Sequence, residues 1–449
     1  MGDPNHVLDG LIEAAGLSHA GLAARLNRAG EDLRLRYDHA SVARWIRDGA
    51  IPRDPVPTMI CQILGSHLGR GLQVADIGMD RRTGSASSLT LSRVVEQAKA
   101  LWRADGRDRL AGPVRKPATG ADAVFPLFEW ENPPLDIDVS QQAGRHIGRN
   151  DVVQVFAARK HYEQMYRRVG GGPVRPRLVA LLANRITPML DGSFDDATGR
   201  MLFRAVGGLV AFAGVCSYDA ELAAQALAQR YFFHALRMAK ASGDRAFGGY
   251  VIALLTNQAI YLGDFRLAIQ YAETALRAGD GHLSPALCTD LYAMQAKAYA
   301  RIGDRAACHR QLGLAEACAT QVIEENEPTE TGYIQPGNTR IKQAEALLRL
   351  GDTTAARTYA LSAISDCDAM NPRARVHGMA TLSMTYAVRT EIEESVAYAQ
   401  RALDEATGME SGRIRERLVE MMTVLAPFGD AHVARDFVER ADAALALRP

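Results

Sequence analysis

The segment "YLGDFRLA", residues 261–268, is the first of a series of similar joints in the C-terminal two thirds of this 449-residue chain. The others are "RIGDRAAC" at 301–308, "RLGDTTAA" at 349–356 and "PFGDAHVA" at 427–434, while "VRTEIEES" at 388–395 has Thr-Glu in place of Gly-Asp. Each joint marks the turn between two helices. The spacings between the glycines, or the threonine that replaces one, are 40, 48, 39 and 39 residues. Periods of this size are expected of stacked helix pairs, so the chain is predicted to be all-α.

Small residues recur at fixed distances from these joints, which indicates that the paired helices approach closely. The relevant positions lie seven residues before, five after and twelve after Gly263, Gly303, Gly351, Thr390 and Gly429. Fourteen of the fifteen positions hold a small residue: Thr256, Ala296, Ala344, Ser383 and (the exception) Met422, then Ala268, Cys308, Ala356, Ser395, Ala434, Ala275, Ala315, Ala363, Ala402 and Ala441. This pattern resembles the tetratricopeptide repeat (TPR), and the resemblance implies a right-handed TPR-like α-solenoid.

Composition limits the possible functions. The formal net charge is zero, so a DNA-binding surface would have to be local. The six cysteines contain no C-x-x-C pair and are expected to be free thiols. The N-terminus lacks a secretory pattern, and the apolar run at 209–216 is far shorter than the ~20 residues of a membrane span. We therefore expect a cytoplasmic protein without a membrane partner.

Three regions can be distinguished along the chain. Residues 1–80 form short helices with tight connections, and residues 146–449 carry the helical repeats. Between them, residues 81–145 are rich in Gly, Pro and Ser and are expected to be a linker that contains a short amphipathic helix at 89–104. The "GGGP" segment at 170–173 lacks a following Lys-Ser/Thr and a preceding strand, so it is expected to be a flexible helix connection and not a phosphate loop.

The N-terminal region has the pattern of a helix-turn-helix module. In "GLSHAGLAARLN", residues 16–27, Ser18 opens a helix, and a second helix lies within "YDHASVARWIRDGAIPR", residues 37–53. Asp38 is expected to cap this second helix, with Val42, Trp45 and Ile46 on its buried face. The two segments resemble the Cro/C1-type repressor family, although the loop between the helices is longer than is typical of that family. Residues 1–80 are thus expected to be a Cro/C1-type DNA-binding domain.

The resemblance implies which side chains would meet double-stranded DNA. His39, Ser41 and Arg44 would face base edges. The phosphate contacts would come from Ser18, His19, Arg25, Arg47 and Arg53. Residues 18–53 contain seven arginines and four acids, a local net charge of +3 in a neutral chain. The alternative is a small helical cap on the solenoid with ordinary solvated arginines.

The first helix of each repeat pair is expected to line a concave face. Counted back from the joints, its polar side chains are Asn257, Tyr261, Lys297, Arg301, Asn338, Lys342, Glu345 and Arg349. Basic and amide groups repeated in one groove could bind an extended peptide or an anionic small molecule. The alternative is a solvated polar face without a ligand.

The order of the parts resembles that of actinobacterial TPR-containing transcriptional regulators, and its layout is similar to that of peptide-responsive quorum-sensing regulators. The resemblance implies a sequence-specific DNA-binding repressor that acts as a homodimer on a palindromic operator. Its TPR domain would mediate dimerisation and bind a peptide or small-molecule effector. No catalytic constellation was found, so neither an enzyme nor a cofactor is expected. A TPR adaptor that binds proteins and not specific DNA is the alternative.

Overall fold

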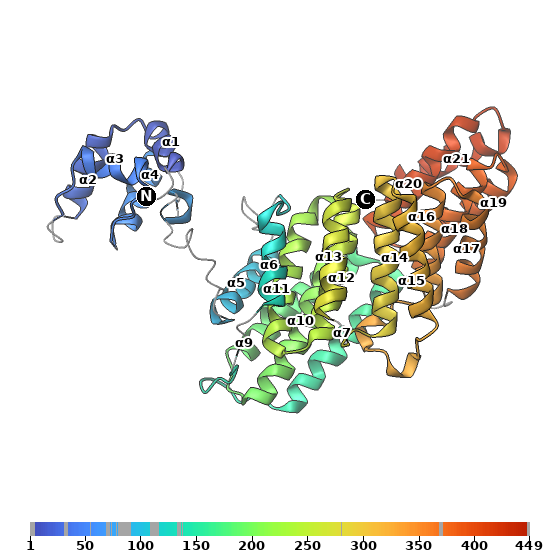
Figure 1. The fold of residues 1–449 in the computed structure, drawn as a ribbon, viewed down its shortest axis with the longest axis horizontal. Coiled ribbons are helices and arrows are strands. Elements are labelled where there is room, and N and C mark those ends of the chain that lie inside the picture. The colour runs from blue at the N-terminus through green and yellow to red at the C-terminus, as the bar shows by residue number, and fades with distance from the viewer. Residues whose placement is uncertain are drawn as a thin grey trace. The chain divides into compact units, whose positions relative to one another are not determined.

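The chain folds into two compact helical units, residues 1–89 and residues 90–449, in the computed structural model (Figure 1). The structure describes residues 5–30, 35–53, 55–68, 72, 74–77, 79, 91–107, 116–132, 136, 138–279, 281–367 and 371–446. Within these ranges every regular element is a helix, and the β-type pairing is limited to two isolated bridges, Gln141 with Phe194 and His146 with Ser193. The predicted all-α class is confirmed.

The described residues of the smaller unit form four helices and one turn of 3-10 helix. They are α1 (His6–Ala14), α2 (His19–Ala29), α3 (His39–Arg47), α4 (Val56–Leu68) and the turn Val74–Ile77. Ser18 begins α2 by accepting a hydrogen bond from the Gly21 amide at 3.1 Å, and Asp38 begins α3 by accepting one from the Ser41 amide at 2.8 Å. Val42 and Trp45 are buried in the core of this unit, as the sequence predicts.

The larger unit begins with two helices and a three-helix bundle. The first two are α5 (Leu91–Asp105) and α6 (Ala121–Glu131). The long helices α7 (Arg149–Val169) and α10 (Asp196–Ala220) pack on α8 (Gly171–Leu181), which continues through a π-helical segment, Leu182–Ile186, into α9 (Thr187–Leu190).

The remaining helices pack as consecutive pairs. After α11 (Gln225–Ser242), which packs on α10, the pairs are α12 (Arg245–Tyr261) with α13 (Phe265–Ala278), α14 (Pro285–Ile302) with α15 (Arg305–Ala319), α16 (Pro336–Arg349) with α17 (Thr353–Asp366), α18 (Pro372–Val388) with α19 (Ile392–Glu405), and α20 (Gly412–Leu425) with α21 (His432–Ala446). The five predicted joints lie between the two helices of these pairs.

The predicted linker over 81–145 is wrong for the part that the structure describes. The amphipathic helix exists as α5, but its Val95, Ala98 and Trp102 are buried in the main core of the larger unit, together with Leu127 and Trp130 of α6. Segments rich in Gly and Pro occur at the ends of helices as well as in linkers. Composition alone therefore placed the start of the C-terminal helical region too late in the chain. The structural boundary lies at residue 89.

The small residues of the repeat pattern lie where the pairs pack. All fourteen are buried, and Cys308 occupies an alanine-sized position with no exposed surface. Ser383 and Ser395 face each other across the α18–α19 pair, and the Ser395 hydroxyl donates to the Ser383 carbonyl at 2.8 Å. Buried hydroxyls at two alanine-like positions thus find their partners within the pair.

Four joints share the left-handed backbone conformation. Gly263, Gly303 and Gly351 have φ of 78°, 82° and 81°, and Thr390 has φ of 60°. Thr390 is the one non-glycine residue with positive φ in the described part of the chain. The fifth joint differs, because Gly429 has φ of −60° and follows a 3-10 turn, Ala426–Phe428.

Among the described helices, α10 alone is both long and apolar enough to resemble a membrane span. By length and composition it could cross a membrane, but 89% of its most hydrophobic window is buried inside the larger unit. Burial against neighbouring helices accounts for this hydrophobicity. The cytoplasmic location remains a prediction.

The first helices of the pairs form an inner layer. Consecutive helices α12, α14, α16, α18 and α20 contact one another side by side, and Figure 1 shows the first four in this order. The layer also closes on itself, because α7 contacts α18 and α10 contacts α20. Seven helices therefore surround a common interior in the larger unit.

Candidate functional site

A cavity of about 990 Å³ lies within this ring of helices. Its walls come from α7, α10, α12, α14, α16, α18 and α20, with further residues from the connections. The structure brings all eight predicted groove residues together on its lining: Asn257, Tyr261, Lys297, Arg301, Asn338, Lys342, Glu345 and Arg349. The register counted back from the joints thus identifies one continuous surface.

The lining carries an excess of positive charge. Nine Lys or Arg side chains and five Asp or Glu side chains face the cavity, a net charge of +4 in a chain that is neutral overall. Five tyrosines share the lining: Tyr166, Tyr218, Tyr250, Tyr261 and Tyr333. A cavity with aromatic walls and excess cations suits ligands that combine rings with negative charge.

A three-residue ion-pair network occupies one wall. Lys297 Nζ lies 2.5 Å from Glu345 Oε2, and Arg417 Nη2 lies 2.7 Å from Glu345 Oε1. Burial alone would raise the pKa of Glu345, but Lys297 and Arg417 hold it well below its usual range. At Lys297 the effect of burial is larger than the effect of the nearby Glu345 charge, so the pKa of the Lys297 ammonium group is lowered. The Glu345 carboxylate is therefore ionised and held in ion pairs with Lys297 and Arg417.

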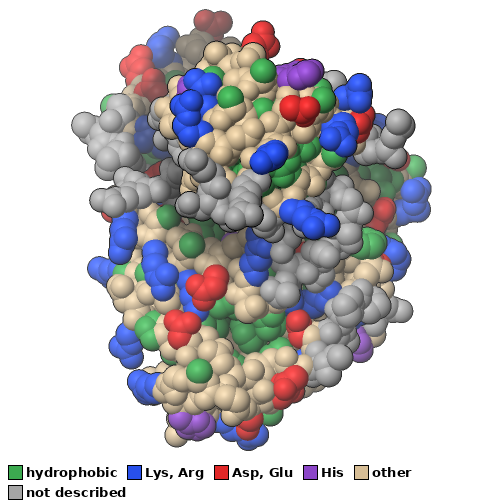
Figure 2. Space-filling model, turned by 90° about the vertical axis from the view of Figure 1, so that its left-hand side faces the viewer, with side chains coloured by type: hydrophobic (Ala, Val, Ile, Leu, Met, Phe, Trp, Pro, Cys, Tyr) green, Lys and Arg blue, Asp and Glu red, His purple; other side chains and the backbone are tan. Residues whose placement is uncertain are grey.

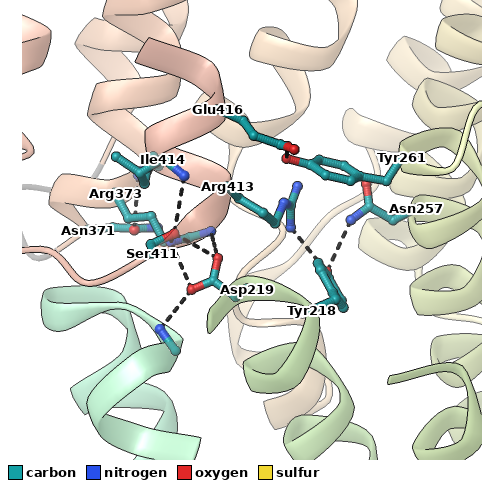
Figure 3. A network of polar contacts seen from close by, with 12 residues as sticks. Tyr218, Asp219, Asn257, Tyr261, Asn371, Arg373, Ser411, Arg413, Ile414 and Glu416 are labelled. Carbon is teal, nitrogen blue, oxygen red and sulfur yellow. Dashed lines mark hydrogen bonds and ion pairs between the residues drawn. The ribbon is translucent and has the colours of Figure 1, made fainter. Parts of the chain in front are cut away.

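Arg413 of α20 is placed differently from these paired cations. Its guanidinium lies over the rings of Tyr218 and Tyr261, at 5.1 and 4.9 Å from the ring centroids, and Nη1 donates to the Tyr218 hydroxyl at 3.1 Å (Figure 3). The Tyr261 hydroxyl bonds to Glu416 on the same helix as Arg413. No ion pair to Arg413 forms among the described residues, and its buried Nε has no hydrogen-bond partner there.

A buried polar cluster adjoins this wall of the cavity. Asp219, at the end of α10, has no exposed surface and pairs with Arg373 of α18. Asp219 also accepts hydrogen bonds from the Ser411 hydroxyl at 2.9 Å and from the Gly171 amide at 2.7 Å (Figure 3). Ser411 in turn caps α20 through the Ile414 amide at 3.2 Å. The cluster ties α8 and α10 to α18 and α20, so we call it the closure cluster.

The "GGGP" segment is part of this closure, which corrects the expectation of a flexible connection. A Cβ on Gly170 would lie 2.5 Å from the Glu410 carbonyl oxygen, and one on Gly171 would lie 2.6 Å from the Cys216 carbonyl oxygen. Glycine is required here because two parts of the backbone meet, and Gly170 also has φ of 83°. The Gly172 amide donates to the Glu410 carbonyl at 3.1 Å.

In the smaller unit, the eight predicted DNA contacts lie on the surface of two packed helices and their ends. Ser18, Arg25, His39, Arg44, Arg47 and Arg53 are exposed, and His19 and Ser41 are half-buried. Some have local partners: His19 bonds to Asp9 at 3.2 Å, and Arg47 pairs with Asp48 at 3.0 Å. The side chains of His39, Arg44 and Arg53 make no hydrogen bond or ion pair to the described residues.

The long loop before α3 is anchored by a residue that the sequence did not single out. The Asn27 side chain donates to the Tyr37 carbonyl at 2.8 Å and accepts from the Tyr37 amide at 2.7 Å. The Tyr37 ring packs edge-on against Trp45 with centroids 5.0 Å apart. These contacts fix the entry to α3 relative to α2, whatever the loop length.

Charged side chains of both signs are mixed on the face drawn in Figure 2. Figure 2 shows Lys and Arg side chains in separate groups, interspersed with Asp and Glu, over the face that it draws. This distribution agrees with the neutral net charge and leaves local arginines as the candidates for contacts to nucleic acid.

Residues 8–80 match a protein family described as the SP15 N-terminal domain. The match lies within the smaller unit and covers α2, α3 and α4 in full. A comparison with curated proteins finds no match to the chain. The smaller unit is therefore similar to a domain that recurs in other proteins.

Proposed function

We propose that the protein is a sequence-specific DNA-binding repressor whose larger unit is an effector-binding, TPR-type solenoid that also mediates homodimerisation. In this proposal the smaller unit is a Cro/C1-type helix-turn-helix domain and α3 is the recognition helix. The effector is a peptide or small molecule held in the cavity, and the operator is palindromic because the dimer has a two-fold axis.

The observation that carries the DNA-binding half of the proposal is the solvent-facing side of α3. His39 and Arg44 are exposed, while Val42 and Trp45 on the opposite side are buried in the core. Arginine can donate two hydrogen bonds to one guanine, and a helix of this size fits the major groove. Arg44 forms no ion pair with the described residues, which leaves its guanidinium available for such a contact.

The stacked helix pairs and the cavity support the sensor half. A ligand that prefers one arrangement of the seven inner helices over another would shift the population of the unit between them. In a dimer, a change in the arrangement of the inner helices would alter the spacing of the two DNA-binding domains. The affinity for the operator would then change.

Fluorescence anisotropy with genomic fragments tests the proposal. The full chain is expected to bind a subset of fragments in a salt-dependent manner, at least about a thousandfold tighter than non-specific DNA. Arg44→Ala should relax the preference at one base pair, at a cost of about 1–3 kcal/mol. Arg103→Ala removes an exposed arginine from α5 and should leave the preference unchanged. Binding limited to non-specific levels would contradict the proposal.

The alternative is a TPR adaptor that binds proteins and no specific DNA. The exposed Phe128 of α6, 57% accessible, is the kind of side chain that a protein partner would cover. Co-purification of a defined protein, with no preference among DNA fragments, would favour this adaptor.

A further inference from the structure

The cavity holds three arginines that form no ion pair with a described carboxylate. Arg413 lies over two tyrosine rings, and the Arg301 guanidinium lies 6.0 Å from the Phe265 ring centroid. The Arg349 side chain lines the cavity and makes no hydrogen bond, ion pair or ring contact with the described residues. These arginines come from three helices, α20, α14 and α16. By contrast Arg159, Lys297, Lys342, Arg373 and Arg417 of the same lining are each paired with an acid.

Arg413 has the features of an anion-binding group. Its position is fixed by Tyr218 and Tyr261, so little side-chain entropy is lost when a ligand binds. Burial opposes its charge, but the surrounding tyrosines and Asp219 more than compensate and keep the pKa of Arg413 above its usual value. A guanidinium that stays charged in a partly desolvated site binds a carboxylate or phosphate more strongly than one in water.

The closure of the helix ring favours a compact ligand. Helices α7 and α10 contact α18 and α20, so the inner face is a partly open cavity bounded by helices on all sides and not a trough that runs along the stack. Its volume, about 990 Å³, lies near the top of the range of about 300–1,000 Å³ found for small-molecule sites. The net charge of +4 on the lining disfavours a cationic ligand and favours an anionic one.

We propose that the cavity binds a compact organic molecule that carries at least two oxyanion groups and an apolar or aromatic part, with Arg413 as its anchor. The oxyanions are carboxylates or phosphates, which share this chemistry. Tyrosine rings line the space for the apolar part. The inference rests on the proposed function only in naming this molecule as the effector, since binding itself does not depend on DNA.

The test uses the full chain and three probes at equal ionic strength: citrate, inorganic pyrophosphate and ATP. At least one probe is expected to raise the melting temperature and to give saturable binding in titration calorimetry. Preference for citrate would identify carboxylates as the favoured oxyanions, and preference for pyrophosphate or ATP would identify phosphates. Stronger binding of ATP than of pyrophosphate would indicate use of the tyrosine walls.

Variants separate the cavity from other basic surfaces. Arg413→Gln is expected to weaken binding at least about tenfold, equivalent to about 1.4 kcal/mol. The double variant Arg301→Gln/Arg349→Gln removes two exposed rim arginines, which leaves the fold intact, and should also weaken binding. Arg103→Gln outside the cavity and Arg44→Gln in the smaller unit should bind as the wild type does.

The inference is overturned if none of the three probes binds, or if Arg413→Gln and the double variant both bind as tightly as the wild type. Loss of binding in Arg44→Gln alone would also overturn it, because the anion would then occupy the DNA-binding surface. Anion binding without specific DNA binding would defeat only the proposed function. Specific DNA binding without anion binding would defeat only this inference.

Discussion

Asp219 and Arg373 lie 154 residues apart in the sequence and form a buried ion pair between the end of α10 and the start of α18. Together with Ser411 and the Gly171 amide, the pair joins the first helices of the larger unit to the last ones. Neighbouring helix pairs in a stack are held by local packing, which does not by itself bring the two ends together. The closure cluster is thus a buried polar contact that, with the Arg413–Tyr218 hydrogen bond, holds the first and last helices of the cavity wall together.

Asp219→Asn should strongly destabilise the larger unit. The substitution leaves Arg373 buried without its counter-charge, and breaking a buried pair in this way costs about 3–5 kcal/mol. Urea denaturation followed by tryptophan fluorescence measures the change, because Trp102 and Trp130 lie in the core of this unit. Asp436→Asn, at an exposed carboxylate paired with His432, is the control and should cost less than about 1 kcal/mol. Equal effects of the two variants would contradict the assigned role.

His377 should make the larger unit less stable in mild acid. Burial, reinforced by Arg373, Arg413 and Arg417, holds the pKa of His377 well below its ordinary value of 6.5. The unfolded chain therefore binds a proton that the folded chain does not, so this stability is complete above pH 6.5 and is lost as the pH falls below it. The free energy of unfolding should therefore be lower at pH 5.5 than at pH 7.5.

The same argument applies to His234, whose pKa is lowered to about 4 by burial and by Arg230. His377→Gln should reduce the pH dependence of the free energy of unfolding, and His234→Gln/His377→Gln should reduce it further. Denaturant titrations at pH 7.5 and 5.5 provide the measurement. A His377→Gln protein that loses as much stability as the wild type over this interval would show that folding does not lower the pKa of His377.

Thr390 is strained in a way that its glycine counterparts are not. A β-branched residue at φ of 60° places Cβ close to its own carbonyl group, at a cost of about 1–2 kcal/mol. Thr390→Gly should therefore raise the free energy of unfolding by up to about 1 kcal/mol after the extra entropy of glycine in the unfolded chain is subtracted. Gly351→Thr should lower it by about 1–2 kcal/mol. Thermal denaturation of both variants should show shifts of opposite sign.

The repeat architecture could be predicted because it depends on local periodicity. Joint residues and small residues recur at fixed spacing, and the structure buries all fourteen small positions. The same register reaches further than the eight groove residues that the sequence suggested. Thirteen residues before Thr390 and Gly429 stand His377 and Glu416, and both line the cavity. Extending the count to the last two pairs would have identified them.

The closure of the ring could not be predicted from the sequence. Arg373 and Ser411 follow no period, and their partner Asp219 lies in a helix that departs from the repeat pattern. Whether Asp219 meets Arg373 and Ser411 depends on the rotation that accumulates from one helix pair to the next. The spacing of small residues does not specify this rotation. The three consecutive glycines at 170–172 indicate that another part of the backbone comes close to them. The sequence does not show that this part is the segment around Glu410.

The last prediction concerns the loop that precedes the proposed recognition helix. Asn27→Ala removes both hydrogen bonds to the Tyr37 backbone and should destabilise the α2–α3 connection by about 1–3 kcal/mol. Hydrogen exchange of peptides that cover 39–47 should accelerate, because α3 loses the anchor at its entry, while peptides from α14 should be unaffected. Gln62→Ala, at an exposed position of α4, is the control and should leave exchange unchanged. Unaltered protection of α3 in Asn27→Ala would mean that the Tyr37–Trp45 packing alone holds the helix in place. If the proposed function is correct, the same variant should bind operator fragments more weakly than Gln62→Ala does.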